Sequence, residues 1–85
     1  MADLMELESF LCGEASLILR GDPESVNPET SLKSLGFDSM SLLELLLSIE
    51  RKYGVLLLNA GLTESDLFSL RSLAARLGRE LDKAG

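Results

Sequence analysis

Leucines recur at steps of three and four residues in three separate stretches of this chain, a spacing that places them on one face of a helix. Leucine, a strong helix former, accounts for 21 of the 85 residues, whereas only six residues are β-branched. Spacing and composition therefore both favour helices over strands, and we expect an all-α fold. The apolar faces of the three expected helices are Leu4, Leu7, Leu11, Ala15 and Ile18; Leu42, Leu45, Leu46, Ile49 and Tyr53; and Leu70, Leu73, Ala74, Leu77 and Leu81.

Residues typical of helix ends bound the first of these stretches. We expect this helix to begin at Ala2 or Asp3, because acids are favourable at the positive end of a helix dipole. It should end at Leu19 or Arg20, with Gly21 as the stop signal.

The second and last helices have similar signals. Asp38 or Ser39 caps the second helix, which should end at about Tyr53 with Gly54 as its stop. Ser69 can cap the last helix, whose outward face we expect to be a solvated surface. That outward face consists of Arg71, Arg76, Arg79 and Lys83.

Two shorter segments connect the long helices. Residues 21–37 contain both prolines and several turn formers, and we expect an ordered loop with one helical turn near residues 31–35. Thr63 and Asp66 have the spacing of a capping box, which predicts a short helix over residues 63–68. The expected architecture is a single domain, residues 1–85, of three longer helices, one short helix and one long crossing loop.

The charge distribution limits the classes of partner. The net charge is −6, and residues 1–29 contain seven acids against one base, Arg20. An acidic chain repels phosphate backbones, so we expect no nucleic-acid partner and a preference for electropositive proteins. No apolar run approaches the roughly 20 residues of a membrane span, and the acidic N-terminus does not resemble a secretory signal. With a single cysteine, Cys12, the chain is compatible with the cytoplasm, where we expect it.

The residue inventory argues against an enzyme. The chain has no histidine, so nucleophile pairs and metal sites that use imidazole are excluded. It has no glycine-rich phosphate loop, and no pair of carboxylates is singled out by spacing. We therefore expect neither catalysis nor a metal site.

One group of residues lies where the long loop meets the most apolar helix. Ser39 places a hydroxyl at the expected helix N-terminus, where the dipole favours an attached anion such as a phosphate ester. Gly36 allows a tight approach, and Asp38 places a carboxylate beside the serine. On these residues alone, Asp38 and Ser39 either cap the helix or form a modification site. The whole group is Leu35, Gly36, Phe37, Asp38, Ser39 and Met40.

Residues 28–45 resemble the signature of acyl and peptidyl carrier proteins. That signature has an apolar residue in the loop, a Leu-Gly-x-Asp-Ser-apolar core, and a Glu-Leu pair five and six positions after the serine, here Glu44 and Leu45. The resemblance continues through residues 49–54 and 72–74 and covers nearly the whole chain.

The resemblance implies an antiparallel four-helix bundle and a modified serine. By position, Ser39 would receive a 4′-phosphopantetheine arm from coenzyme A through a separate phosphopantetheinyl transferase. The arm would hold an acyl or aminoacyl group as a thioester, supplied by a loading ligase and used by a ketosynthase or other pathway enzyme. In similar carriers, the positions of Met40, Leu43 and Leu47 face partner enzymes, flanked by Glu44 and Glu50; Phe37 would serve packing or docking.

The resemblance leaves the cargo open. We expect a free-standing, monomeric acyl carrier for polyketide, specialised fatty-acid or nonribosomal-peptide synthesis, and the Asp-Ser pair slightly favours acyl over peptidyl cargo. A discrete peptidyl or aminoacyl carrier is the alternative, and an unmodified helical interaction domain is the alternative from another class. Arg51 and Lys52 depart from the strongly acidic second helix of many fatty-acid carriers, which argues against a partner with a uniformly basic groove.

Overall fold

The computed structural model describes residues 3–84, and these residues form helices joined by turns. In chain order the elements are α1 (Leu4–Leu19), the 3-10 helix η1 (Pro23–Ser25), α2 (Leu32–Leu35), α3 (Ser39–Tyr53), η2 (Leu57–Asn59) and α4 (Leu70–Ala84). Within residues 3–84 no strand occurs beyond an isolated bridge between Ser31 and Ser69. The prediction of an all-α fold with three long helices and a short one is confirmed.

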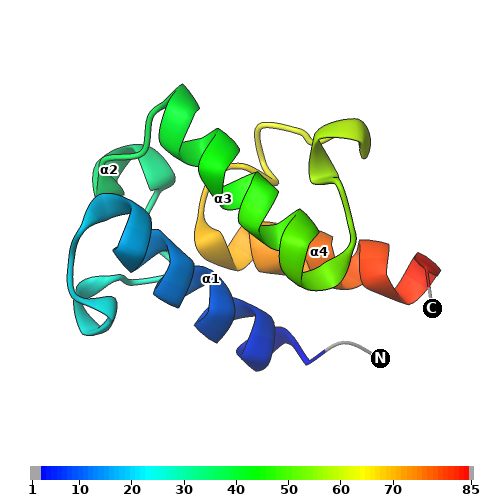
Figure 1. The fold of residues 1–85 in the computed structure, drawn as a ribbon, viewed down its shortest axis with the longest axis horizontal. Helices are drawn as coiled ribbons and strands as arrows, with labels where there is room; N and C mark the ends of the chain where they lie inside the picture. Colours follow the sequence, from blue (N-terminus) through cyan, green and yellow to red (C-terminus); the bar gives the residue numbers. More distant parts are fainter. Residues whose placement is uncertain (1–2, 85) are drawn as a thin grey trace.

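The three long helices share one buried core, and α1 runs antiparallel to α3 and α4 (Figure 1). α1 crosses the view in one direction, and α3 and α4 return in the other, so both ends of the chain lie on the same side. α1 contacts both α3 and α4. The buried core joins all three long helices, α2 and η2, and comprises Leu7, Leu11, Ala15, Leu32, Leu45, Leu46, Ile49, Leu57, Leu70, Leu73, Ala74 and Leu77.

α1 begins one residue after the predicted start, with Asp3 as its cap, and ends at Leu19 as predicted; its left-handed stop residue differs from the prediction. Asp3 caps it by accepting a hydrogen bond from the Met5 N–H at 3.0 Å, whereas Ala2 lies outside the described residues. The left-handed residue at its end is Arg20, with φ of 58°, and not Gly21. The Gly21 N–H instead donates to the Ser16 carbonyl at 2.8 Å, so the helix stop lies one residue earlier than the glycine indicates.

The long loop is ordered because it is hydrogen-bonded to the start of α4. The Leu32 N–H donates to the Phe68 carbonyl at 2.8 Å, and the Arg71 N–H donates to the Pro28 carbonyl at 2.9 Å. The Arg71 guanidinium also pairs with Glu8 of α1 at 3.1 Å and with Glu29 of the loop. The expected helical turn is present as α2.

The short helix predicted at residues 63–68 is a single hydrogen-bonded turn. Its capping box is present: the Asp66 N–H donates to Thr63 Oγ1 at 3.2 Å, and the Thr63 N–H donates to Asp66 Oδ2 at 3.1 Å. The Ser69 and Ser72 side chains cap α4 immediately afterwards. The caps at Thr63 and Ser69 are six residues apart and leave room for one turn only. The short helix of this fold is therefore α2 and not residues 63–68.

Arg76 corrects the prediction of a uniformly solvated outer face on α4. Its side chain is only 14% exposed and pairs with Asp66 at 2.6 Å. It also donates to the carbonyls of Ala60 and Gly61, so it holds residues 60–66 against α4. Hydrogen bonds from the Thr63 amide and then from Arg76 lower the pKa of the Asp66 carboxyl.

Candidate functional site

The candidate site lies at the junction of α2 and α3. Gly36 ends α2 in the left-handed region, with φ of 102°, and its N–H donates to the Lys33 carbonyl at 3.1 Å. The Phe37 N–H donates to the Leu32 carbonyl at 3.0 Å, and its half-buried side chain packs against the core. This pair of bonds reverses the chain into α3. A Cβ on Gly36 would meet no atom of this chain within 4 Å, so within the described structure it is the left-handed backbone angle that requires glycine here.

Asp38 is the cap of α3. Its Oδ1 accepts hydrogen bonds from the Ser41 N–H at 2.9 Å and from the Ser41 hydroxyl at 2.7 Å. In return, the Asp38 N–H donates to Ser41 Oγ at 2.9 Å. These contacts form a capping box, and they occupy both the Asp38 carboxylate and the Ser41 hydroxyl. Of the two caps that the sequence allows, the structure selects Asp38.

Ser39 is the first residue of α3, and its side chain is exposed. Within residues 3–84 no hydrogen bond involves its hydroxyl, in contrast to that of Ser41. A phosphate ester on this oxygen would lie at the positive end of a 15-residue helix, where backbone dipoles stabilise negative charge. The residues at this junction therefore fit an attached phosphate group.

The capping contacts predict a pH dependence of stability. Hydrogen bonds from Ser41 lower the pKa of Asp38 below its ordinary value of 3.8. The folded protein thus binds fewer protons than the unfolded chain, so the cap stabilises fully above pH 3.8 and loses its effect as the pH falls through the lower folded-state pKa. We expect Asp38→Ala to be less stable than the wild type in urea at about pH 6, and the difference to narrow towards about pH 3. A difference independent of pH would contradict this prediction.

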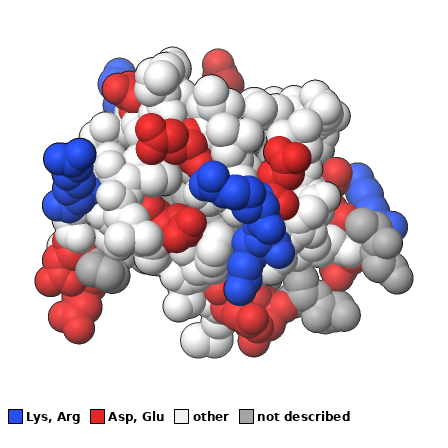
Figure 2. Space-filling view, in the orientation of Figure 1, with Lys and Arg blue, Asp and Glu red and all other residues white. Residues whose placement is uncertain are grey.

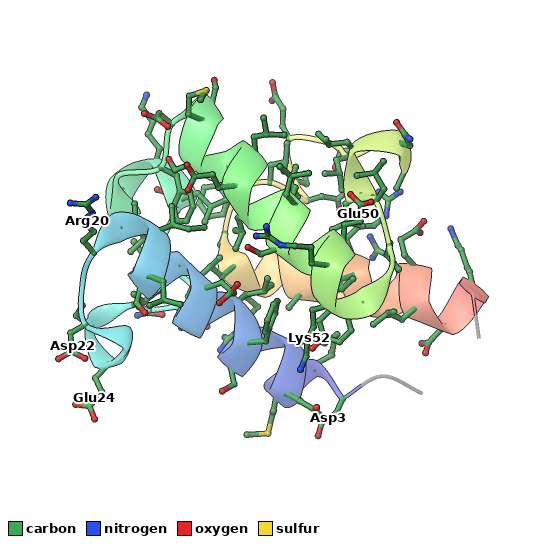
Figure 3. All side chains as sticks on the ribbon, viewed as in Figure 1. Asp3, Arg20, Asp22, Glu24, Glu50 and Lys52 are labelled. Carbon is green, nitrogen blue, oxygen red and sulfur yellow. The ribbon has the colours of Figure 1, made fainter. Side chains whose placement is uncertain are left out.

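The structure leaves the outer side of α3 uncovered. Met40, Leu43 and Leu47 are 69%, 38% and 39% exposed, and Glu44 and Glu50 are exposed as well. Figure 3 shows Glu50 on the side of α3 towards the η2 segment and Lys52 on the side towards α1. The Lys52 ammonium lies over the Phe10 ring of α1, 5.8 Å from its centre. The five exposed residues form one surface beside Ser39, and Phe37 is half-buried at its edge.

Sequence reasoning missed that the exposed surface continues onto α1. A groove between α1 and α3 is lined by Leu17 together with Leu47, and Leu17 is 73% exposed. Leu17 falls outside the periodic face of the first helix, because residues 11, 15 and 18 are on that face and residue 17 is not. The position of Leu17 outside the periodic face was the sequence feature that could have indicated its exposure.

Residues 3–84 offer neither a metal cluster nor a membrane-spanning helix. Among residues 3–84, no cluster of three or more His, Cys, Asp or Glu residues could hold a metal ion. None of the helices described is long and apolar enough to cross a membrane. Cys12 is half-buried against the core, and burial raises the pKa of its thiol.

Comparison with known protein families matches this chain to the phosphopantetheine attachment site family over residues 9–79. No curated protein matches the chain closely enough to count as a relative. The family match includes all of α3 and the α2–α3 junction, and most of α1 and α4. Proteins of this family carry a phosphopantetheine arm, are served by phosphopantetheinyl transferases and pathway enzymes, and are not themselves catalysts. This agrees with the resemblance and with the expectation that the chain is not an enzyme. The chain therefore belongs to the phosphopantetheine-binding carrier proteins.

Proposed function

We propose that Ser39 is the residue that bears the phosphopantetheine arm. The observation that carries this proposal is the contrast between two nearby hydroxyls at the start of α3. The Ser41 hydroxyl donates to Asp38 at 2.7 Å and is held in the capping box, whereas the Ser39 hydroxyl is exposed and in no hydrogen bond within residues 3–84. Of the two, only Ser39 is presented to a modifying enzyme.

Attachment needs no catalytic group from this chain. Ser39 Oγ forms the new bond to the β-phosphorus of coenzyme A, adenosine 3′,5′-bisphosphate leaves, and the transferase accepts the serine proton. The chain contributes a rigid turn at Gly36, a cap at Asp38 and a helix end whose dipole favours the resulting phosphodiester. When bound, the arm supplies a terminal thiol that holds cargo as a thioester.

We propose that the exposed side of α3 contacts the enzymes that load and use the cargo. Met40, Leu43 and Leu47 supply apolar contact area, and Glu44 and Glu50 supply charge at its borders. The exposed edge of Phe37 adjoins this surface. The loading enzyme would be an acyl or aminoacyl ligase, and the consuming enzyme a ketosynthase or a comparable pathway enzyme.

Acyl cargo in polyketide, specialised fatty-acid or nonribosomal-peptide synthesis is the function that we favour. The support is the Asp38–Ser39 pair, and a discrete peptidyl or aminoacyl carrier is the second candidate. We propose a monomer in the cytoplasm, where coenzyme A and the transferase act. An unmodified interaction domain is the candidate from another class.

Intact-mass measurement after incubation with coenzyme A and a broad-specificity transferase tests the proposal. We expect the mass to rise by one phosphopantetheine group, with peptide mapping placing it on the peptide that contains Ser39. No mass increase, together with a folded circular dichroism spectrum, would favour the unmodified interaction domain. Transfer of an amino acid by an adenylating enzyme, in preference to an acyl group, would favour the aminoacyl carrier.

A further inference from the structure

A groove of about 410 Å³ runs between the C-terminal half of α1 and the outer side of α3. Both helices contribute to its lining, so it is formed only when they are packed together. Its residues are Glu14, Leu17 and Ile18 on α1, and Glu44, Leu47, Ser48 and Arg51 on α3. Two of them, Glu44 and Leu47, are in the surface already proposed to contact partner enzymes.

The apolar part of this groove has no cover within residues 3–84. Leu17 is 73% exposed, whereas Leu7 and Leu11 of the same helix are buried in the core. Leu47 faces the same groove from α3. An exposed pair of leucines from two helices is an expected anchor point for an apolar side chain of another molecule.

The polar part of the groove carries charges of both signs in a defined order. Glu44 and Arg51 are seven residues apart on α3, so they lie on one face about 10 Å apart along the helix axis, with Leu47 between them. No ion pair joins Arg51 to Glu14 or Glu44 in the described part of the chain; the Arg51 guanidinium donates to Ser48 Oγ at 3.2 Å. Figure 2 shows basic side chains in the middle of this face, with acidic groups on either side.

We propose that the partner-docking surface extends from α3 onto α1 through this groove, and that its occupant is an amphipathic helix of a partner enzyme. That helix carries one apolar side chain between a basic and an acidic one. The basic side chain meets Glu14 and Glu44, the apolar one meets Leu17 and Leu47, and the acidic one meets Arg51. This proposal rests on the proposed carrier function and deepens it by stating the chemistry of the partner.

A partner helix fits the groove better than a second copy of this chain. A stable dimer buries about 800 Å² on each subunit, and it relies on an extended apolar patch. This groove offers two leucines within a charged border, which is suited to a contact that forms and dissociates at each delivery. A uniformly basic partner surface is also disfavoured, since it would bring like charge against Arg51.

Helical peptides and nuclear magnetic resonance test the proposal with the full chain, before any arm is attached. Lactam-bridged peptides would carry Lys–Leu–Glu, Lys–Leu–Lys or Glu–Leu–Glu on one face and be otherwise identical. We expect the Lys–Leu–Glu peptide to shift the amide signals of residues 14–18 and 44–51 and to bind about two- to fivefold more tightly than the Lys–Leu–Lys peptide, as for exposed ion pairs. The Arg51→Glu variant should instead bind the Lys–Leu–Lys peptide more tightly than the Lys–Leu–Glu peptide.

Leu17→Asp separates docking on α1 from docking on α3 alone. Leu17 is exposed, so the variant should remain folded while its affinity for the Lys–Leu–Glu peptide falls about tenfold. Met5→Asp, at another exposed position of α1, is the matched control and should bind like the wild type. Peptides that leave residues 14–18 unshifted, or that bind with equal affinity, would overturn the proposal.

Occupation of the groove by a second copy of this chain would also overturn the proposal. It would appear as concentration-dependent shifts of the amide signals of residues 14–18 and 44–51 in the absence of peptide. Peptide binding involves no reaction at Ser39, so its failure is distinct from a failure of arm attachment.

Discussion

Replacing Ser39 with alanine is expected to abolish the mass increase that coenzyme A and a phosphopantetheinyl transferase produce. The reason is that the substitution removes the only oxygen that forms the bond to phosphorus. The fold should be retained, because Ser39 is exposed, is not the cap of α3, and its hydroxyl makes no hydrogen bond within residues 3–84. We expect its free energy of unfolding to change by less than about 0.5 kcal/mol.

Ser41→Ala is the matched control, because it removes a hydroxyl two residues away on the same turn. It should still accept one arm, but it should melt at a lower temperature because the capping box is lost. Ser39→Ala should thus lose modification and keep its stability, whereas Ser41→Ala should keep modification and lose stability. Arm addition to the Ser39→Ala protein, or its loss in a folded Ser41→Ala protein, would contradict the assignment.

Leu45→Ala should lower the free energy of unfolding by about 2–5 kcal/mol in a urea titration, because it leaves a cavity in the core. Leu45 is completely buried. A domain of this size has a total stability on the order of 4–13 kcal/mol, so this loss would be a large fraction of the total free energy of unfolding.

Leu47→Asp, two residues further along α3, is the control for this prediction. Leu47 is 39% exposed, and the variant should lose about 1 kcal/mol or less, the cost of a poor helix former at a surface position. The same variant should impair loading or transfer of cargo, since Leu47 lies in the proposed docking surface. An equal loss of stability in the two variants would place Leu47 in the core and remove it from that surface.

Periodic leucines made the helices predictable. The buried apolar residues of α3, Leu45, Leu46 and Ile49, fall on the face that the spacing of apolar residues identifies. Helix ends were predictable where a side chain caps its own backbone, as Asp3 and Asp38 do. Both signals are local, and a local interaction can be read from neighbouring residues.

Features that depend on distant residues were not predictable in this way. Arg76 looks like a surface residue of an amphipathic helix, and its burial follows only from the carbonyls of residues 60 and 61 that approach it. The exposure of Leu17 likewise follows from where α3 crosses α1. The candidate site shows both cases: the proposal of Ser39 as the modified residue comes from its sequence motif, whereas the choice of Asp38 over Ser39 as cap required the geometry.

The hydrogen bonds that connect the long loop to α4 have a consequence for synthesis on the ribosome. Leu32 is bonded to Phe68, and Glu29 is paired with Arg71, 42 residues later in the chain. A nascent chain that has emerged only as far as α3 already displays Ser39 but lacks the residues that hold the preceding loop in place. A transferase acting at Ser39, as proposed above, would therefore meet the folded α2–α3 junction only after α4 has left the ribosome, and arm attachment would report that α4 has been made and packed.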